Sequence, residues 1–275
     1  IGVIGGSMIK SINGRTQYLK AASARTNPSP LEHALSGITQ VSISNMDEAG
    51  LPPSLVATAS KSVVGSLVGS LDEGGLSKNQ IGGALKNITS KAVDSLDQIE
   101  GISPSDITSS LKEITSGATS ALDQIEVSDY SASDLGEMVQ EISSGATQAL
   151  GNIEIDGISS DNLSSMMEKV TAGATGALGQ ISMEGYSSSN LTTMLSKITS
   201  GATSALGDIE MEGYSSNNLS LMVEKITAGA TSALDEIKLE GFSSDNLSSM
   251  VQEITSGATG ALDEIEMAGF DPSTD

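Results

Sequence analysis

Apolar side chains return at steps of three and four residues along most of this chain. Residues 241–268 show the pattern most clearly, with the sequence GFSSDNLSSMVQEITSGATGALDEIEMA. Steps of this kind, sustained over about five turns, predict an amphipathic helix rather than a strand. Ser243, Ser244 and Asp245 precede the pattern and supply the side-chain oxygens typical of a helix N-cap. The apolar positions of this unit are Leu247, Met250, Val251, Ile254, Ala258, Ala261, Leu262 and Ile265.

The unit repeats along the chain with a fixed period. The tripeptide Gly-Ala-Thr returns at one constant spacing, and its glycines are Gly117, Gly145, Gly173, Gly201, Gly229 and Gly257. A fixed period of about 20 to 50 residues is the signature of a solenoid or array. We therefore predict an all-α fold, a helical repeat array or solenoid with 28-residue units and an irregular N-terminal region.

A short step from glycine to a hydrophobic residue opens most units and divides the chain. It falls at Gly50, Gly75 and Gly101, and its position then recurs with the same constant period from residue 129 to residue 269. The spacing predicts an atypical basic N-terminal arm and cap region at 1–49 and divergent helical repeats at 50–128. Regular 28-residue helical repeats are predicted at 129–275, where residues 269–275 open a further, incomplete unit.

The glycine at the centre of each unit is an unusual choice, because an interior glycine costs a helix about 1 kcal/mol relative to alanine. One helix of roughly 20 residues would use this glycine to let a second helix approach closely, whereas two short helices would break there. The apolar steps cross Gly257 without a change of phase, which favours one continuous helix. The residues predicted for the repeat core and its close contacts are Gly117, Gly145, Gly173, Gly201, Gly229, Gly257, Leu191, Ile198 and Leu206.

Threonine and aromatic residues also recur. Thr199 and Thr203, like their equivalents, lie four residues apart on one helical face. We interpret them as small residues at a tight helix contact, each hydroxyl bonded to a carbonyl one turn earlier, rather than as an ice-binding array or O-glycan sites. One loop position carries Tyr130, Tyr186, Tyr214, Phe242 and Phe270, but also Ile102 and Ile158. Since isoleucine cannot stack, this column is interpreted as a wedge that anchors each loop.

Charge is distributed unevenly. The formal net charge is −22, from 13 basic and 35 acidic residues, yet residues 1–30 hold four basic residues and no acid. Residues 1–30, the basic arm, therefore carry +4 and residues 31–275 carry −26. An acidic body repels nucleic acid, since binding there depends on neutralising phosphates. No apolar run is long enough to predict a transmembrane segment.

The residues that carry most enzyme chemistry are scarce. The chain has no cysteine, and His33 is its one histidine, so neither a thiolate metal site nor a multi-histidine site is expected. Carboxylates recur near the predicted helix ends but form no alternating calcium loop, and they are interpreted as a solvated acidic face. We predict no enzyme, no cofactor and no metal site.

Asn-x-Ser/Thr recurs in the first turn of several predicted helices. If the protein is exported from a eukaryotic or archaeal cell, these asparagines are candidate N-glycan acceptors; a short polar residue also suits that position of a helix. The candidates are Asn87, Asn162, Asn190, Asn218 and Asn246. The sequence starts with Ile1 rather than methionine, which favours a processed protein of the extracellular space or cell surface.

The leading functional prediction is a structural subunit of an extracellular filament or surface appendage that assembles head to tail into a homopolymer. The basic arm of one subunit would dock on the last repeats of the next, because a contact that does not close gives an open polymer. The arm residues assigned to this contact are Ile1, Val3, Ile4, Met8, Ile9, Lys10, Arg15, Lys20 and Arg25. The alternative is a surface-anchored or secreted α-solenoid that binds a protein or glycan.

Overall fold

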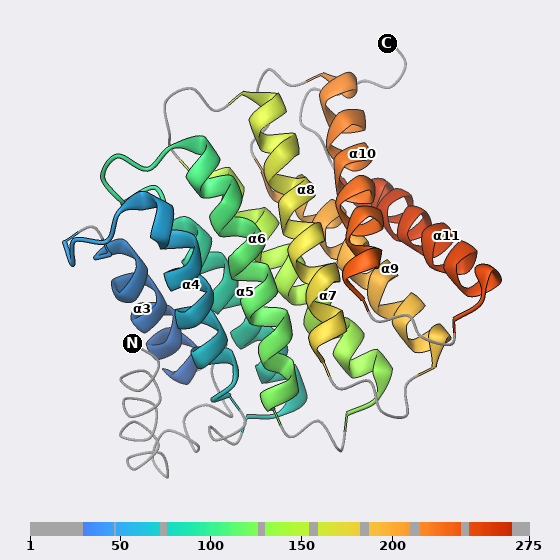
Figure 1. The fold of residues 1–275 in the computed structure, drawn as a ribbon, viewed down its shortest axis with the longest axis horizontal. Coiled ribbons are helices and arrows are strands. Elements are labelled where there is room, and N and C mark those ends of the chain that lie inside the picture. The colour runs from blue at the N-terminus through green and yellow to red at the C-terminus, as the bar shows by residue number, and fades with distance from the viewer. Residues whose placement is uncertain are drawn as a thin grey trace.

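A computed structural model shows a helical repeat array (Figure 1). It describes residues 30–46, 48–71, 76–125, 130–153, 159–181, 187–209, 215–237 and 242–265. Within these ranges the regular structure is entirely helical, which confirms the predicted all-α repeat fold. The α-helices are α3 (Pro30–Ser44), α4 (Pro53–Val68), α5 (Lys78–Asp94), α6 (Pro104–Ser120), α7 (Ala132–Ala149), α8 (Ser160–Ala177), α9 (Ser188–Ser204), α10 (Ser216–Ser232) and α11 (Ser244–Gly260).

Each regular unit contains one α-helix, and the central glycine lies inside it. The last turn then tightens into a 3₁₀ helix, after which the chain becomes extended at an isoleucine such as Ile209. The 3₁₀ helices are η2 (Ala121–Gln124), η4 (Leu150–Asn152), η5 (Leu178–Gln180), η6 (Ala205–Asp208), η7 (Ala233–Glu236) and η8 (Ala261–Glu264). The interpretation of one continuous helix, rather than two short ones, therefore holds.

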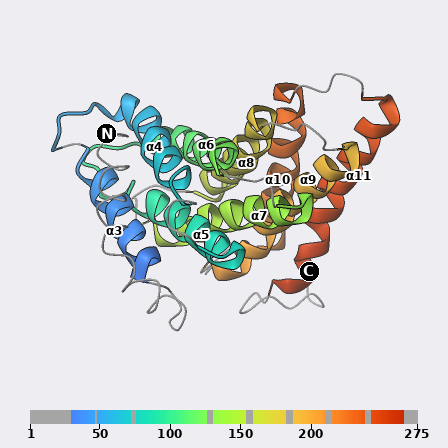
Figure 2. The same ribbon diagram turned by 90° about the horizontal axis from the view of Figure 1, so that it is seen from below.

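The helices form two layers, which Figure 2 shows edge on. Helices α3, α5, α7, α9 and α11 pack side by side in one layer, and α4, α6, α8 and α10 form the other. Helices within a layer run parallel: Lys78 and Asp134 join the N-terminal ends of α5 and α7, and Asp94 and Asn152 meet where these helices end. Consecutive helices switch layers, so each helix packs chiefly on the second helix before it and the second after it.

The helix starts follow from local chemistry. In α9 the Ser187 hydroxyl accepts a hydrogen bond from the Asn190 backbone N–H, and the Asn190 side-chain oxygen accepts one from the Ser187 N–H. This capping box pairs donors that the first turn would otherwise leave without a partner, and α7, α8, α10 and α11 have the same arrangement. Gly50 and Gly101, which open earlier units, have φ of 76° and 75°, a left-handed conformation that favours glycine.

Candidate assembly surface

The closest contact between helices of one layer is made by the central glycine of each unit. A Cβ atom at Gly201 in α9 would lie 2.5 Å from the backbone oxygen of Gln140 in α7, a separation that real Cβ contacts essentially never have. Gly229 meets the backbone oxygen of Glu168, and Gly257 that of Ser196, in the same way. The glycine thus faces the preceding helix of its layer, and any side chain there would push the two helices apart.

In α8 and α9 the first threonine of the pair joins the opposite face of the helix to the next helix in its layer. Thr199 Oγ1 in α9 lies 3.2 Å from the Leu195 oxygen one turn earlier and 3.0 Å from the Ile254 oxygen in α11. Thr171 in α8 reaches the Ile226 oxygen of α10 at the same distance. Both threonines are fully buried, so they form helix contacts and no surface array.

The second threonine of each pair behaves differently. Thr119, Thr147, Thr175 and Thr203 are also fully buried, but their hydroxyl oxygens have no hydrogen-bond partner within the described structure. Their equivalent in the last helix, Thr259, is exposed and donates to the Thr255 oxygen at 2.9 Å. The equally buried first threonines, by contrast, do donate to the carbonyl one turn earlier.

Within the described ranges, large apolar side chains are exposed only on the first described helix of each layer and on the last described helix. Leu191 and Leu195 of α9 are buried beneath the next helix of the layer, whereas their equivalents in α11, Leu247 and Val251, are 39% and 40% exposed. The other large hydrophobic residues exposed in the described ranges are Val41 of α3 and Leu55 of α4, at 61% and 53%. All four lie on the first or last described helix of a layer, at opposite ends of the described array (Figure 1).

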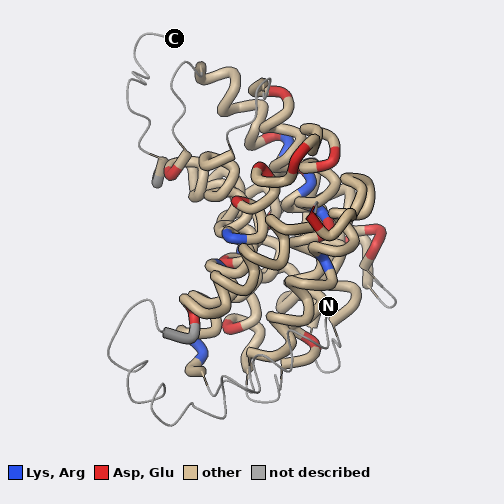
Figure 3. The backbone as a smooth tube through the Cα atoms, turned by 90° about the vertical axis from the view of Figure 1, so that its left-hand side faces the viewer, with Lys and Arg blue, Asp and Glu red and all other residues tan. Residues whose placement is uncertain are grey.

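Ion pairs connect neighbouring helices within each layer. Lys225 of α10 donates to the carboxylate of Glu168 in α8 at 2.9 Å. Burial raises the pKa of Glu168, but the hydrogen bond from Lys225 and the charges of Lys169 and Lys225 bring it below its usual value. Figure 3 shows that acidic and basic residues are spread along the array rather than gathered in one cluster. The cross-helix pairs are thus distributed along the array and build no single charged site among the described residues.

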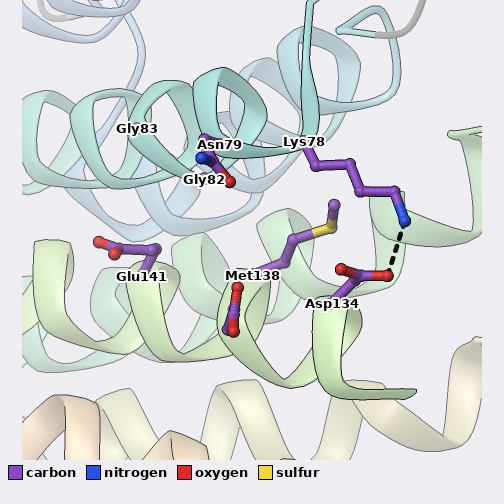
Figure 4. A pocket seen from close by; sticks show the side chains of 8 residues that line it. Lys78, Asn79, Gly82, Gly83, Asp134, Met138 and Glu141 are labelled. Carbon is purple, nitrogen blue, oxygen red and sulfur yellow. Dashed lines mark hydrogen bonds and ion pairs between the residues drawn. The ribbon is translucent and has the colours of Figure 1, made fainter. Parts of the chain in front are cut away.

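A shallow cavity of about 170 Å³ lies between α5 and α7, where Gly82 and Gly83 leave room (Figure 4). Lys78 pairs with Asp134 at its edge at 2.8 Å, and this hydrogen bond, followed by the one from the Ser131 backbone, lowers the pKa of Asp134 to about 2. Burial raises the pKa of Glu141, partly offset by the charge of Lys86. Within the described residues no set of three or more His, Cys, Asp or Glu side chains could hold a metal ion.

The other residues named in the sequence analysis lie in the core, on the surface or outside the described residues. Leu191, Ile198 and Leu206 are buried, and His33 is exposed in the first turn of α3. Tyr130 and Phe242 are partly buried and pack against the core. Tyr186, Tyr214, Phe270 and the nine arm residues lie outside the described residues. No described helix has both the length and the apolar character needed to cross a membrane.

Four of the five candidate glycan acceptors take part in helix capping. Asn162, Asn190, Asn218 and Asn246 each stand at the third position of a helix, where the side-chain oxygen accepts hydrogen bonds from the N-cap serine. Asn87 is half-buried within α5. The sequence pattern could not distinguish a capping asparagine from a glycan acceptor, since both use the same short amide.

Comparison with known proteins assigns no family to the chain. No family model matches the chain, and no curated protein does. One solved chain, from a structure described as "Computational Design of Self-Assembling Cyclic Protein Homooligomers", covers 96% of this chain and 98% of its own length, with 12% sequence identity and a TM-score of 0.40. The chain is a helical repeat protein.

Proposed function

We propose that this protein is a structural subunit that assembles head to tail, as in an extracellular filament or surface appendage. The observation that carries the proposal is the position of the exposed large hydrophobic residues, Val41 and Leu55 on the first described helix of each layer and Leu247 and Val251 on the last described helix of the array. Exposed apolar surface of this kind is typical of interaction sites. Its presence at both ends favours contact between ends.

The exposed face of α11, the last described helix, supports this function for a geometric reason. The face of α11 that bears Leu247 and Val251 corresponds to the face of α9 that α11 covers. A helix stacked there would meet the same kind of surface that is buried inside the array. Because the two ends of the array differ, their contact is heterologous and leaves a new open end, so growth can continue. A specific contact would need about 800 Å² of buried surface per partner.

The N-terminal arm is assigned to this contact. Residues 1–30 carry +4 and the rest of the chain −26. Charge complementarity of this kind sets direction and register more than affinity. Ile1, Val3, Ile4, Met8 and Ile9 would cover apolar surface at the open end of the next subunit, and Lys10, Arg15, Lys20 and Arg25 would meet its carboxylates.

Sedimentation velocity and negative-stain microscopy over a range of protein concentrations test the proposed function. The full chain is expected to form long polymers, and Val251→Arg to shift it to monomer with unchanged helical circular dichroism, because a charge would then stand in the apolar contact. Ser109→Arg, on an exposed position of α6, is the matched control and should polymerise. Removing residues 1–30 should also give a helical monomer. A full chain that stays monomeric at every concentration and salt would rule out the proposal.

A second candidate function is a binding module for a protein or glycan at the cell surface. The cavity between α5 and α7 favours it, because Gly82 and Gly83 break the repeat pattern there and leave Glu137 and Glu141 beside an open space. This function requires a chain that remains monomeric, so the same sedimentation experiment separates the two candidates. Neither function assigns a catalytic role to any residue.

A further inference from the structure

Three consecutive repeat units share a pattern of four residues. Lysine is followed by glycine after four residues, threonine after six and leucine after nine, as in Lys225, Gly229, Thr231 and Leu234 of α10 and its 3₁₀ turn. The units of α8 and α9 carry the same pattern from Lys169 and Lys197. The N-terminal arm carries it once more, with the same spacing, at Lys10, Gly14, Thr16 and Leu19. The arm therefore repeats a residue pattern that α8, α9 and α10 share.

In α10 the structure shows what the lysine and the glycine of this pattern do. Lys225 pairs with the Glu168 carboxylate of α8 at 2.9 Å, and Gly229 rests on the backbone oxygen of the same residue. Thr171 of α8 completes the contact by reaching the Ile226 oxygen at 3.0 Å. The receiving surface on α8 thus consists of a glutamate, its own carbonyl and a threonine three residues later.

Helix α10 repeats this receiving surface one step further along its layer. Glu224 and Thr227 stand two repeat units after Glu168 and Thr171 and have the same residue types. Glu224 is exposed, whereas Glu168 is engaged by Lys225. Thr227 reaches the Val223 oxygen of its own helix at 2.9 Å, but no cross-helix bond like that of Thr171 is formed in the described structure. The surface is complete in its residues and has no stacked helix among those described.

The other layer ends in a similar way. In α3 the Thr39 hydroxyl donates to the Leu35 oxygen, as Thr199 does to Leu195 in α9. This correspondence places Val41 at the position of Gly201, on the face that meets the preceding helix of a layer. Val41 is 61% exposed. A valine holds two helices farther apart than glycine does, but it supplies apolar surface for another exposed apolar face.

We infer that a second copy of the chain stacks on the C-terminal end in the register of the repeat, an inference that rests on the proposed function. Residues 10–19 of the second copy lie on α10, with Lys10 on the Glu224 carboxylate and Gly14 on the Glu224 backbone oxygen. Helix α3 of the second copy lies on α11, with Val41 against Leu247 and Val251. The two layers then continue across the junction, because each new helix takes the next place in its layer.

Charge exchange tests the pair that sets the register. Lys10→Glu and Glu224→Lys are each expected to raise the concentration needed for polymerisation about tenfold or more, since each places like charges in contact. The two changes in one chain should return it close to the original value. The two single changes shift the net charge in opposite directions, so a loss of polymerisation in both cannot be an effect of net charge alone.

A mixing experiment tests whether the two ends meet. Gly14→Leu disables the docking segment and Val251→Arg disables the receiving end, so each chain alone should be monomeric by sedimentation. Their equimolar mixture should give a discrete dimer, because one intact segment meets one intact end and growth then stops. Gly6→Leu, also in the arm, should leave polymerisation unchanged.

The outcomes separate this inference from the function on which it rests. A full chain that never polymerises would contradict both this inference and the proposed function. A second outcome is that the full chain polymerises, Val251→Arg prevents polymerisation and Gly14→Leu does not. That result would support the receiving end and contradict the assignment of residues 10–19 as the docking segment. Polymers that tolerate both substitutions, or a mixture that stays monomeric, overturn the inference and leave end-to-end assembly by another contact.

Discussion

At the scale of the residue, the close packing of the array depends on the absence of a side chain at the central glycine of each unit. Gly201 lies so close to the Gln140 backbone that a methyl group would overlap it. The period of the glycine and the uninterrupted apolar steps indicated a close contact, but they could not identify the partner. That partner lies on α7, the second helix before α9 in the chain.

Alanine substitutions test the role of this glycine with a matched control. Gly201→Ala should destabilise the fold by about 1–3 kcal/mol, because the added methyl meets a backbone oxygen that cannot turn away. Gly37→Ala in α3 adds the same methyl where nothing lies within 4 Å, and it should stabilise by up to about 1 kcal/mol through helix propensity. Urea denaturation of both variants measures the difference, and equal effects of the two changes would show that the close contact is unimportant.

The two buried threonines of α9 should respond in opposite ways to valine, which has nearly the same shape. Thr199→Val removes a hydroxyl that bonds within α9 and to α11 and should cost about 1 kcal/mol. Thr203→Val removes a buried hydroxyl without a partner in the described structure, and it should stabilise by about 1 kcal/mol because its desolvation is relieved. Thermal and urea unfolding provide the measurement; a destabilised Thr203→Val would reveal a partner, such as a bound water.

At the scale of the element, each helix is defined by local signals and held by its layer. The serine N-cap was readable from the sequence, because serine, asparagine and aspartate oxygens pair the free N–H groups of a first turn. The final 3₁₀ turn was not foreseen: in α9 it follows Ser204, and it delivers Leu206 into the core before the chain becomes extended at Ile209, which is also buried.

Removing a capping serine tests the start of a helix. Ser187→Ala should destabilise the protein by about 0.5–2 kcal/mol, since both the Asn190 N–H and the Asn190 side chain lose a partner. Ser189→Ala, at an exposed position in the first turn of the same helix, is the control and should change stability by less than about 0.5 kcal/mol. Similar losses for both serines would contradict the capping assignment.

The ion pair between α8 and α10 predicts a dependence on pH. The folded pKa of Glu168 lies below its ordinary value of 4.5, so its contribution is fully present above that value and is lost as the pH falls through the folded pKa. Glu168→Gln should therefore be less stable than the natural chain at pH 7, and the difference should shrink as the pH falls below 4.5 and through the folded pKa of Glu168. Urea denaturation across pH 3 to 7 measures this; a difference that does not change with pH would assign the effect to packing instead.

At the scale of the whole molecule, stability is built from contacts between each helix and its neighbours. Helix α9 packs on α7 and α11 within its layer and on α8 and α10 across the layers. No single core residue holds the array together, because the buried residues run continuously through it. This explains why a unit can recur with small changes: each copy needs to fit only the helices beside it.

Insertion of a whole unit tests this modular design. A second copy of residues 187–214 placed after residue 214 should fold, with helical content per residue preserved and cooperative unfolding retained, because every helix still meets an equivalent neighbour. Insertion of residues 201–214 alone adds half a unit, which breaks the spacing, and it should lower the melting temperature by several degrees or more. Circular dichroism follows both; equal tolerance of the two insertions would argue against neighbour-by-neighbour packing.

The sequence by itself determined the local and periodic features of this protein. Apolar steps of three and four dictate the helices, serine and asparagine dictate their starts, and the constant period dictates that the units are equivalent. It could not determine which helices meet, since nearly identical units offer nearly identical faces to any partner. The tertiary structure decided that each helix packs on the second helix along the chain, because consecutive helices lie in different layers. Within a layer the parallel helices then place a glycine of one helix against the backbone of the preceding helix, and a threonine against a carbonyl oxygen of the next helix. Only that arrangement revealed that Val41, Leu247 and Val251 lie exposed at the two ends of the array.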